Sequence, residues 1–139
     1  MRGRYSHNID AKGRVFVPAK MREVLGDTFV VATVMEPCIG LYTLEGWNEM
    51  LEKLEQLPMT KSRQLLRYLS SNAADVQVDS QGRILLPKHL MEHAGLLKEA
   101  LIIGAGANRA EIWNPEKYDE VVGSMTDEDV VADFMALGL

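Results

Sequence analysis

The chain has 139 residues, of which 47% are hydrophobic and 25% charged, and its mean hydropathy is −0.09. This composition suits a globular protein with one domain or two small ones, and it excludes a disordered chain, a collagen and a membrane span. The formal net charge is −5 and the isoelectric point is about 5.2, which as averages argue against a nucleic-acid-binding protein.

Cysteine content and the N-terminal residues indicate the compartment. Cys38 is the single cysteine, so an intramolecular disulfide and a cysteine-based zinc cage are excluded, and we expect Cys38 to be a buried small hydrophobe. The first residues lack the apolar segment of a signal peptide, and no window approaches eighteen apolar residues. The sequence therefore predicts a soluble intracellular protein.

The first predicted elements surround an Asp-x-x-Gly turn. Apolar and polar residues alternate before the turn, which indicates a half-buried strand, and Gly13 can take the positive φ that such a turn needs. Pro18 favours a helix start and Gly26 a helix end. In chain order, this segment is predicted to contain a strand at 5–9, a strand at 15–17, a helix from 18 to about 25, and strands at 29–34 and 39–43.

Helices are predicted in the middle and at the end of the chain. Leucines at three- and four-residue steps indicate one helix that Pro58 stops and a second around 65–69. A last helix begins at Thr126, with Asp129 in a capping position. We expect the eight methionines to fill the core.

The sequence repeats itself. Ile9–Pro18 aligns with Val78–Pro87 at an offset of 69, and Phe29–Ala32 aligns with Ala100–Ile103 at an offset of 71. The chain therefore holds two copies of a β-β-α-β-β unit. One such unit buries too little surface to be stable alone, so we expect the halves to complete each other as a pseudo-dimer with one barrel-like core. The predicted divisions are 5–47 for the first unit, 48–75 for a helical connector, 76–119 for the second unit and 120–139 for an acidic helical tail.

Positive charge is concentrated at one end. Residues 1–22 carry a net charge of +5, and the other 117 residues carry −10. Such a basic segment attracts phosphate, and arginine can bind guanine O6 and N7 or a phosphate in a bidentate manner. The alternative is an ordinary set of solvated cations. The candidate DNA-binding residues are Arg14, Lys12, Arg22, Arg4, Arg2, Lys20 and, from the second copy, Arg83.

Both copies contain an Asp-x-x-Gly-Arg motif, made of Asp10, Gly13 and Arg14 in the first and of Asp79, Gly82 and Arg83 in the second. Its presence in both predicts a structural part, in which the aspartate caps the turn or pairs with an arginine. Three cations of the first copy are replaced, because Lys12, Lys20 and Arg22 become Gln81, His89 and Met91. We therefore assign DNA contact chiefly to the first copy, and Arg83 is equally well explained as structural.

These twin segments resemble the swapped-hairpin DNA-binding unit of the SpoVT-AbrB superfamily. The tandem arrangement, the start Met-Arg-Gly-Arg-Tyr and the segment Leu-Tyr-Thr-Leu-Glu-Gly-Trp at 41–47 resemble the MraZ family of bacterial transcriptional regulators. The similarity extends from about Arg2 to Tyr118. In the related domains, arginines of the turn and helix contact DNA; Arg14 and Arg22 fill these positions, and His7 fills a further basic position before the turn.

The resemblance implies an α+β protein in which two tandem swapped-hairpin units form a pseudo-dimeric β-barrel. It further implies a cytoplasmic, nucleoid-associated regulator of its own division and cell-wall gene cluster, which binds short G-rich direct repeats of double-stranded DNA as a homo-oligomeric ring. We expect no enzymatic activity, cofactor, metal, membrane partner or small-molecule substrate.

Two alternatives remain. An antitoxin-like module of the same fold would have a protein as its main partner and the tail as its binding segment. A metalloenzyme would use His89 and His93, which with Glu92 match a zinc-protease pattern, but it needs a third ligand and a substrate cleft, and the first copy has no such histidines.

Overall fold

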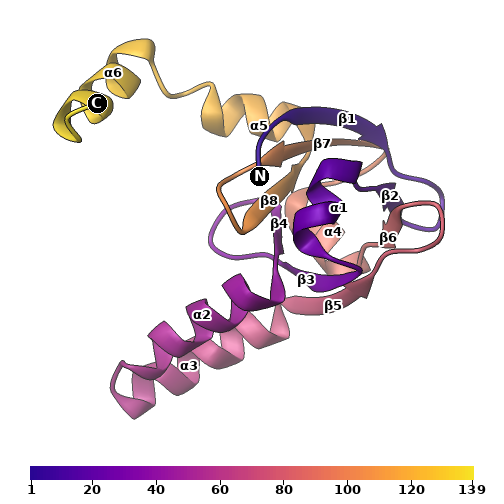
Figure 1. Ribbon diagram of the computed structural model, residues 1–139, viewed down its shortest axis with the longest axis horizontal. Coiled ribbons are helices and arrows are strands. Elements are labelled where there is room, and N and C mark those ends of the chain that lie inside the picture. The colour runs from indigo at the N-terminus through magenta and orange to yellow at the C-terminus, as the bar shows by residue number, and fades with distance from the viewer.

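Eight strands and six helices form the protein in the computed structural model, which describes residues 1–139 (Figure 1). In chain order they are β1 (Arg4–Asn8), β2 (Arg14–Phe16), α1 (Ala19–Leu25), β3 (Thr28–Ala32), β4 (Ile39–Tyr42), α2 (Leu44–Glu55), α3 (Met59–Ser71), β5 (Ala73–Gln77), β6 (Arg83–Leu85), α4 (Lys88–Ala94), β7 (Glu99–Gly104), β8 (Arg109–Trp113), α5 (Pro115–Val122) and α6 (Asp127–Ala136). The predicted α+β class and the β-β-α-β-β order of both halves are confirmed.

The two halves interleave in one six-stranded antiparallel sheet, whose strand order is β1-β7-β8-β4-β3-β5. The first strand of each half pairs with the third strand of the other half, because β1 lies beside β7 and β5 lies beside β3. The central neighbours β4 and β8 also come from different halves. Each half thus supplies hydrogen-bonding partners that the other half lacks.

A separate two-stranded ribbon joins the halves a second time. In this ribbon β2 pairs with β6, and Val15 lies opposite Ile84. Beyond the ribbon the backbone bonds are reciprocal, since the N–H of Val17 donates to the carbonyl of Gly82 and the N–H of Leu86 donates to the carbonyl of Gly13, both at 2.9 Å. Each short strand therefore ends against the turn of the opposite half.

The sheet and the ribbon enclose one core. Nineteen buried hydrophobic residues from both halves form a single cluster, in which Phe29, Ile84 and Ile112 are at most 1% exposed. Only Met21 of the eight methionines is buried, so the expectation that methionines fill the core is wrong for the exposed Met35, Met59, Met125 and Met135.

Cys38 lies in a small buried cluster with Leu101 and Trp113, as predicted. Burial, followed by the nearby carboxylate of Glu111, raises the pKa of the Cys38 thiol to about 12. The thiol is therefore protonated at neutral pH and is a poor nucleophile.

The helices outside the core are of two kinds. Helices α2 and α3 form a hairpin that projects from the sheet (Figure 1), and Trp47 and Leu69 anchor its base against β3 and β4. Helix α5 is an addition to the predicted elements, and it begins after Asn114, whose side chain accepts from the N–H groups of residues 116 and 117. No helix is both long and apolar enough to cross a bilayer.

At the end of the chain, the capping box between Thr126 and Asp129 at the start of α6 is confirmed.

A shared core predicts that damage in one half destabilises the whole chain. We expect Ile84→Ala to lower the free energy of unfolding by about 2–5 kcal/mol, because it removes buried methyl groups and leaves a cavity. The neighbouring Leu85→Ala is the matched control and should cost under about 1 kcal/mol, since Leu85 is 58% exposed. Urea denaturation followed by circular dichroism and by tryptophan fluorescence should give one coincident transition; two separate transitions would contradict the shared core.

Candidate nucleic-acid interface

Each Asp-x-x-Gly-Arg motif forms a tight turn closed by its aspartate. The Oδ1 atom of Asp10 accepts from the N–H of Lys12 at 3.0 Å and from the N–H of Arg14 at 2.8 Å. Gly13 has a φ of +87°, which explains the glycine at this position. The second turn is built identically, since Asp79 accepts from the N–H groups of residues 81 and 83, both at 2.9 Å. Both aspartates thus accept two backbone N–H groups of their own turn.

Each aspartate also accepts a hydrogen bond from the Nε atom of the arginine in its own turn. The Nε of Arg14 donates to Oδ2 of Asp10 at 2.7 Å, and the Nε of Arg83 donates to Oδ2 of Asp79 at 3.1 Å. The terminal amine groups of Arg14 have no hydrogen-bond partner in the protein, and its side chain is 32% exposed. An arginine fixed in this way presents two parallel N–H donors outward.

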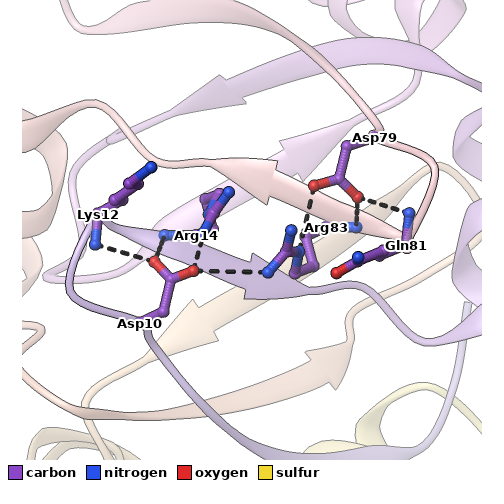
Figure 2. A network of polar contacts seen from close by, with 6 residues as sticks. All are labelled: Asp10, Lys12, Arg14, Asp79, Gln81 and Arg83. Carbon is purple, nitrogen blue, oxygen red and sulfur yellow. Dashed lines mark hydrogen bonds and ion pairs between the residues drawn. The ribbon is translucent and has the colours of Figure 1, made fainter.

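The two turns are linked by a contact between the halves. Figure 2 shows that the guanidinium group of Arg83 reaches Asp10, with 3.6 Å between Nη1 and Oδ2, in addition to its own Asp79. Arg83 therefore lies between two carboxylates, whereas Arg14 pairs with one. The charge of Arg83 is more fully neutralised inside the protein, which favours its structural role over its role as a free ligand.

Both aspartates are stabilised in the ionised form. The backbone N–H of Arg14 is the largest influence that lowers the pKa of Asp10, and its side chain adds to the effect. The backbone N–H of Arg83 lowers the pKa of Asp79 in the same way. Hydrogen bonds to a carboxylate favour its charged form, so both turns keep their ion pairs at neutral pH.

Residues of the second half surround the first turn. A Cβ atom built on Gly13 would lie 3.5 Å from the sulfur of Met91, which belongs to α4. An open groove of about 870 Å³ runs along residues 8–13 and is also lined by Lys88 and Lys98. Three lysines, Lys12 among them, thus line the groove beside Arg14. Lys88 and Lys98 are absent from the predicted set, because the excess of positive charge in the sequence lies in residues 1–22 alone.

Arg22 lies beside the second turn instead of the first. The Nε of Arg22 donates to the carbonyl of Val17 at 2.9 Å, and its Cζ lies 5.2 Å from the ring centroid of Phe16. A Cβ built on Gly82 would lie 3.0 Å from this Cζ. Lys20 is exposed in the first turn of the same helix. The strand exchange accounts for this position, since β2 leads α1 toward the opposite half.

The remaining candidates are dispersed. His7 packs edge-on against Phe16 at 5.0 Å between ring centroids. Arg4 lies at the start of β1, opposite Ile103, and its guanidinium group lies 5.1 Å from the ring centroid of Tyr118. Arg2 precedes that strand and is exposed. The cations of residues 1–22 therefore form no single cluster: they divide between the first turn, the second turn and the far end of β1.

The histidine pattern of α4 acquires no further ligand. His89 and His93 are exposed, and no group of three or more His, Cys, Asp or Glu side chains lies close enough together to hold a metal ion. The third ligand that the metalloenzyme alternative requires is therefore missing.

Comparison with known proteins gives consistent matches along the chain. A family model described as "MraZ protein, putative antitoxin-like" matches residues 1–67 and 69–134. Among curated relatives, the protein named transcriptional regulator MraZ of Heliobacterium modesticaldum is 44% identical over 141 residues, covering 92% of this chain and 98% of the relative. Its namesakes from Lachnoclostridium phytofermentans and Acetivibrio thermocellus are 44% and 40% identical, covering 96% and 99% of this chain and 94% and 98% of their own lengths.

The pairing of aspartate and arginine can be measured by titration. We expect the pKa of Asp10 to lie below its ordinary value of 3.8 and Arg14→Ala to raise it partway, because the backbone N–H of residue 14 still donates. Since this pKa is lowered by folding, the ionised turn stabilises the fold at neutral pH, and that contribution is lost as the pH falls below about 4. Carbon-detected NMR of the carboxyl groups checks this. In the control, Lys53→Ala removes an exposed cation outside both turns and should leave the pKa of Asp10 unchanged; an unaltered pKa of Asp10 in Arg14→Ala would refute the contact.

Proposed function

The chain belongs to the MraZ family, and on this premise we propose that it is a transcriptional regulator that binds double-stranded DNA, with Arg14 as the principal base-reading side chain. Its relatives carry the name of transcriptional regulators, which is a non-enzymatic role. The observation that carries the proposal is the fixed guanidinium group of Arg14, whose free amines point away from Asp10 at a turn bordered by lysines.

Arginine held at Nε is suited to reading guanine. Its two terminal amines can donate to O6 and N7 of one guanine in the major groove, and this bidentate contact is the commonest specific contact to DNA. The reorientation cost is small, because Asp10 already orients the side chain before DNA arrives. G-rich repeats are the sequences that such a side chain would select.

The lysines around the first turn would contact phosphates. Lys12, Lys88 and Lys98 line one groove, and flexible ammonium groups serve as point charges for the sugar-phosphate backbone. Arg22, beside the second turn, and Lys20, exposed on α1, would also contact phosphates, whereas Arg83 is held between two carboxylates and would keep the two turns in place. Arg2 and Arg4, at the far end of β1, would reach DNA only where it extends along that edge.

Few base contacts per chain require several chains per site. A single turn that reads one guanine binds weakly, but a ring that presents several turns to evenly spaced repeats gains affinity through effective concentration. We assign the interleaved strands to the swapped-hairpin arrangement of the SpoVT-AbrB superfamily, and we place the protein on nucleoid DNA in the cytoplasm, upstream of its own division and cell-wall genes. The strand pairing β1–β7 and β5–β3 supports the fold assignment.

Removal of the Arg14 side chain should abolish specific binding. We expect Arg14→Ala to lower affinity for a G-rich repeat probe by at least about tenfold, since a good bidentate contact contributes about 1–3 kcal/mol and each probe engages several copies. Fluorescence anisotropy against the DNA upstream of the gene measures this, with a scrambled probe for non-specific binding. Lys53→Ala, on exposed α2, is the matched control that also removes one cation. Unchanged affinity of Arg14→Ala would refute the site.

The lysines should affect salt dependence instead of sequence preference. Lys12→Ala and the double variant Lys88→Ala/Lys98→Ala should weaken binding to G-rich and scrambled probes alike, because phosphate contacts carry no sequence information. The slope of log affinity against log salt concentration should fall in magnitude by about 0.9 for each phosphate that the variant no longer neutralises. A salt titration of the same anisotropy assay checks this. Loss of discrimination between the probes without a change of slope would contradict the assignment to phosphates.

A further inference from the structure

Helix α6 presents an apolar stripe that packs against nothing else in the chain. The stripe consists of Val131, Phe134 and Met135, which are 54%, 52% and 71% exposed. No residue of α6 is buried or belongs to a hydrophobic cluster, and Figure 1 shows the helix clear of the body of the molecule. A ten-residue helix is marginal in isolation, so a surface that covers the α6 stripe would stabilise it.

The α6 stripe is bordered by acidic side chains. At 100° per residue, Glu128 projects next to one edge of the stripe, and Asp127 projects on the stripe's side of the helix, one turn before Val131. Asp129 and Asp133 lie on the opposite side of the helix and add to the negative charge, and no cation occurs between residues 118 and 139. A partner surface should therefore be apolar at its centre and positively charged at its rim.

Helix α3 provides a surface of this description. A shallow groove of about 400 Å³ lies along it, lined by Met59, Ser62, Arg63, Leu66, Arg67 and Ser70, which we call the α3 groove. Met59 is 73% exposed, although it is a large apolar side chain. Arg63 and Arg67 are exposed and form no ion pair, and residues 56–74 contain no acidic side chain.

We propose that α6 of one copy of this chain docks into the α3 groove of a second copy. The α6 stripe would cover the apolar side chains of the groove, and Asp127 and Glu128 would pair with its two arginines. The complementary charge selects this occupant, since the α6 stripe carries anions alone at its edges and the α3 groove carries cations alone. An anionic lipid surface is disfavoured by the same charges on α6.

The α6 stripe and the α3 groove lie on separate parts of the chain, so a contact between them joins two different surfaces of neighbouring copies. Helix α6 follows the sheet at the C-terminus, whereas α3 belongs to the projecting hairpin (Figure 1). A contact between two different surfaces is heterologous, and repetition of it closes into a ring when the rotation per copy permits. The inference thus rests on the proposed ring assembly and names the surfaces that would join its members.

A charge-swap series tests the contact. Arg63→Glu/Arg67→Glu and Asp127→Lys/Glu128→Lys should each weaken association by about tenfold or more, and their combination in one chain should restore it. Both pairs spare the capping residue Asp129. Lys53→Glu, an exposed cation outside the α3 groove, is the control and should leave association unchanged. Sedimentation velocity at matched concentration and salt gives the readout. If neither swap affects association, the proposal is overturned, and the partner of α6 is a different protein.

Disulfide trapping tests the contact without disturbing the charges. Met59→Cys and Met135→Cys proteins, mixed and oxidised, should give a cross-linked dimer that contains one of each, and the buried, protonated Cys38 should not react. The Met59→Cys protein mixed with Val24→Cys, an exposed position on α1, is the control. Absence of the mixed dimer, or an internal disulfide in the doubly substituted chain, overturns docking between copies.

Binding to a probe with a single G-rich repeat separates the two proposals. This probe engages one turn, so the α6 and α3 variants should bind it like the unaltered protein and lose affinity only for multiple repeats. Normal single-repeat binding together with failed charge rescue would overturn the interface and leave the proposed function standing. Successful charge rescue together with no Arg14-dependent DNA binding would overturn the function and leave the interface standing.

Discussion

The pairing of β2 with β6 is the constraint on which the rest of the structure depends. Three residue pairs form this ribbon, and it continues into the reciprocal bonds from Val17 to Gly82 and from Leu86 to Gly13. Each half therefore needs the turn of the other half to satisfy the backbone N–H group that follows its short strand. Because every strand of the ribbon is buried at its centre, the same pairing also closes the shared core.

This constraint places the two Asp-x-x-Gly-Arg turns side by side and makes them unequal. Asp10 interacts with two guanidinium groups, whereas Asp79 interacts with one, so Arg83 is held from both sides and Arg14 from one. A side chain with fewer internal partners keeps more donors for an external ligand. The inequality between the two arginines arises from geometry between the halves, and it does not follow from the sequences of the motifs, in which Asp, Gly and Arg are the same.

Local features of the fold and the sharing of one core by the two halves can be predicted from the sequence, whereas the residues that meet between the halves cannot. The repeat, the β-β-α-β-β order within each half and the capping of α6 by Thr126 depend on short stretches of chain, and the sequence predicts them correctly. The sequence groups Arg22 with Arg14 because both follow one turn, yet Arg22 lies beside Gly82. Lys88 and Lys98 join the first turn for the same reason, since β6 delivers α4 to it. Helix α5 could have been predicted from the sequence, because Asn114 is a favourable N-cap residue and Pro115 occupies the first position of the helix.

The interleaving of the halves changes which parts of the chain supply the positive and the negative regions of the surface. The net charge of −5 divides into basic turns and acidic helices, but the basic turns draw cations from both halves, whereas the acidic tail is contributed by the second half alone. A DNA-binding protein that works by several weak contacts must keep its anions away from its turns, since repulsion at each contact would multiply over the assembly. Sequestering the acidic α6 against the cations of a neighbouring α3 would meet this requirement, because the same contact that adds another turn to the assembly also neutralises the anions that would repel DNA.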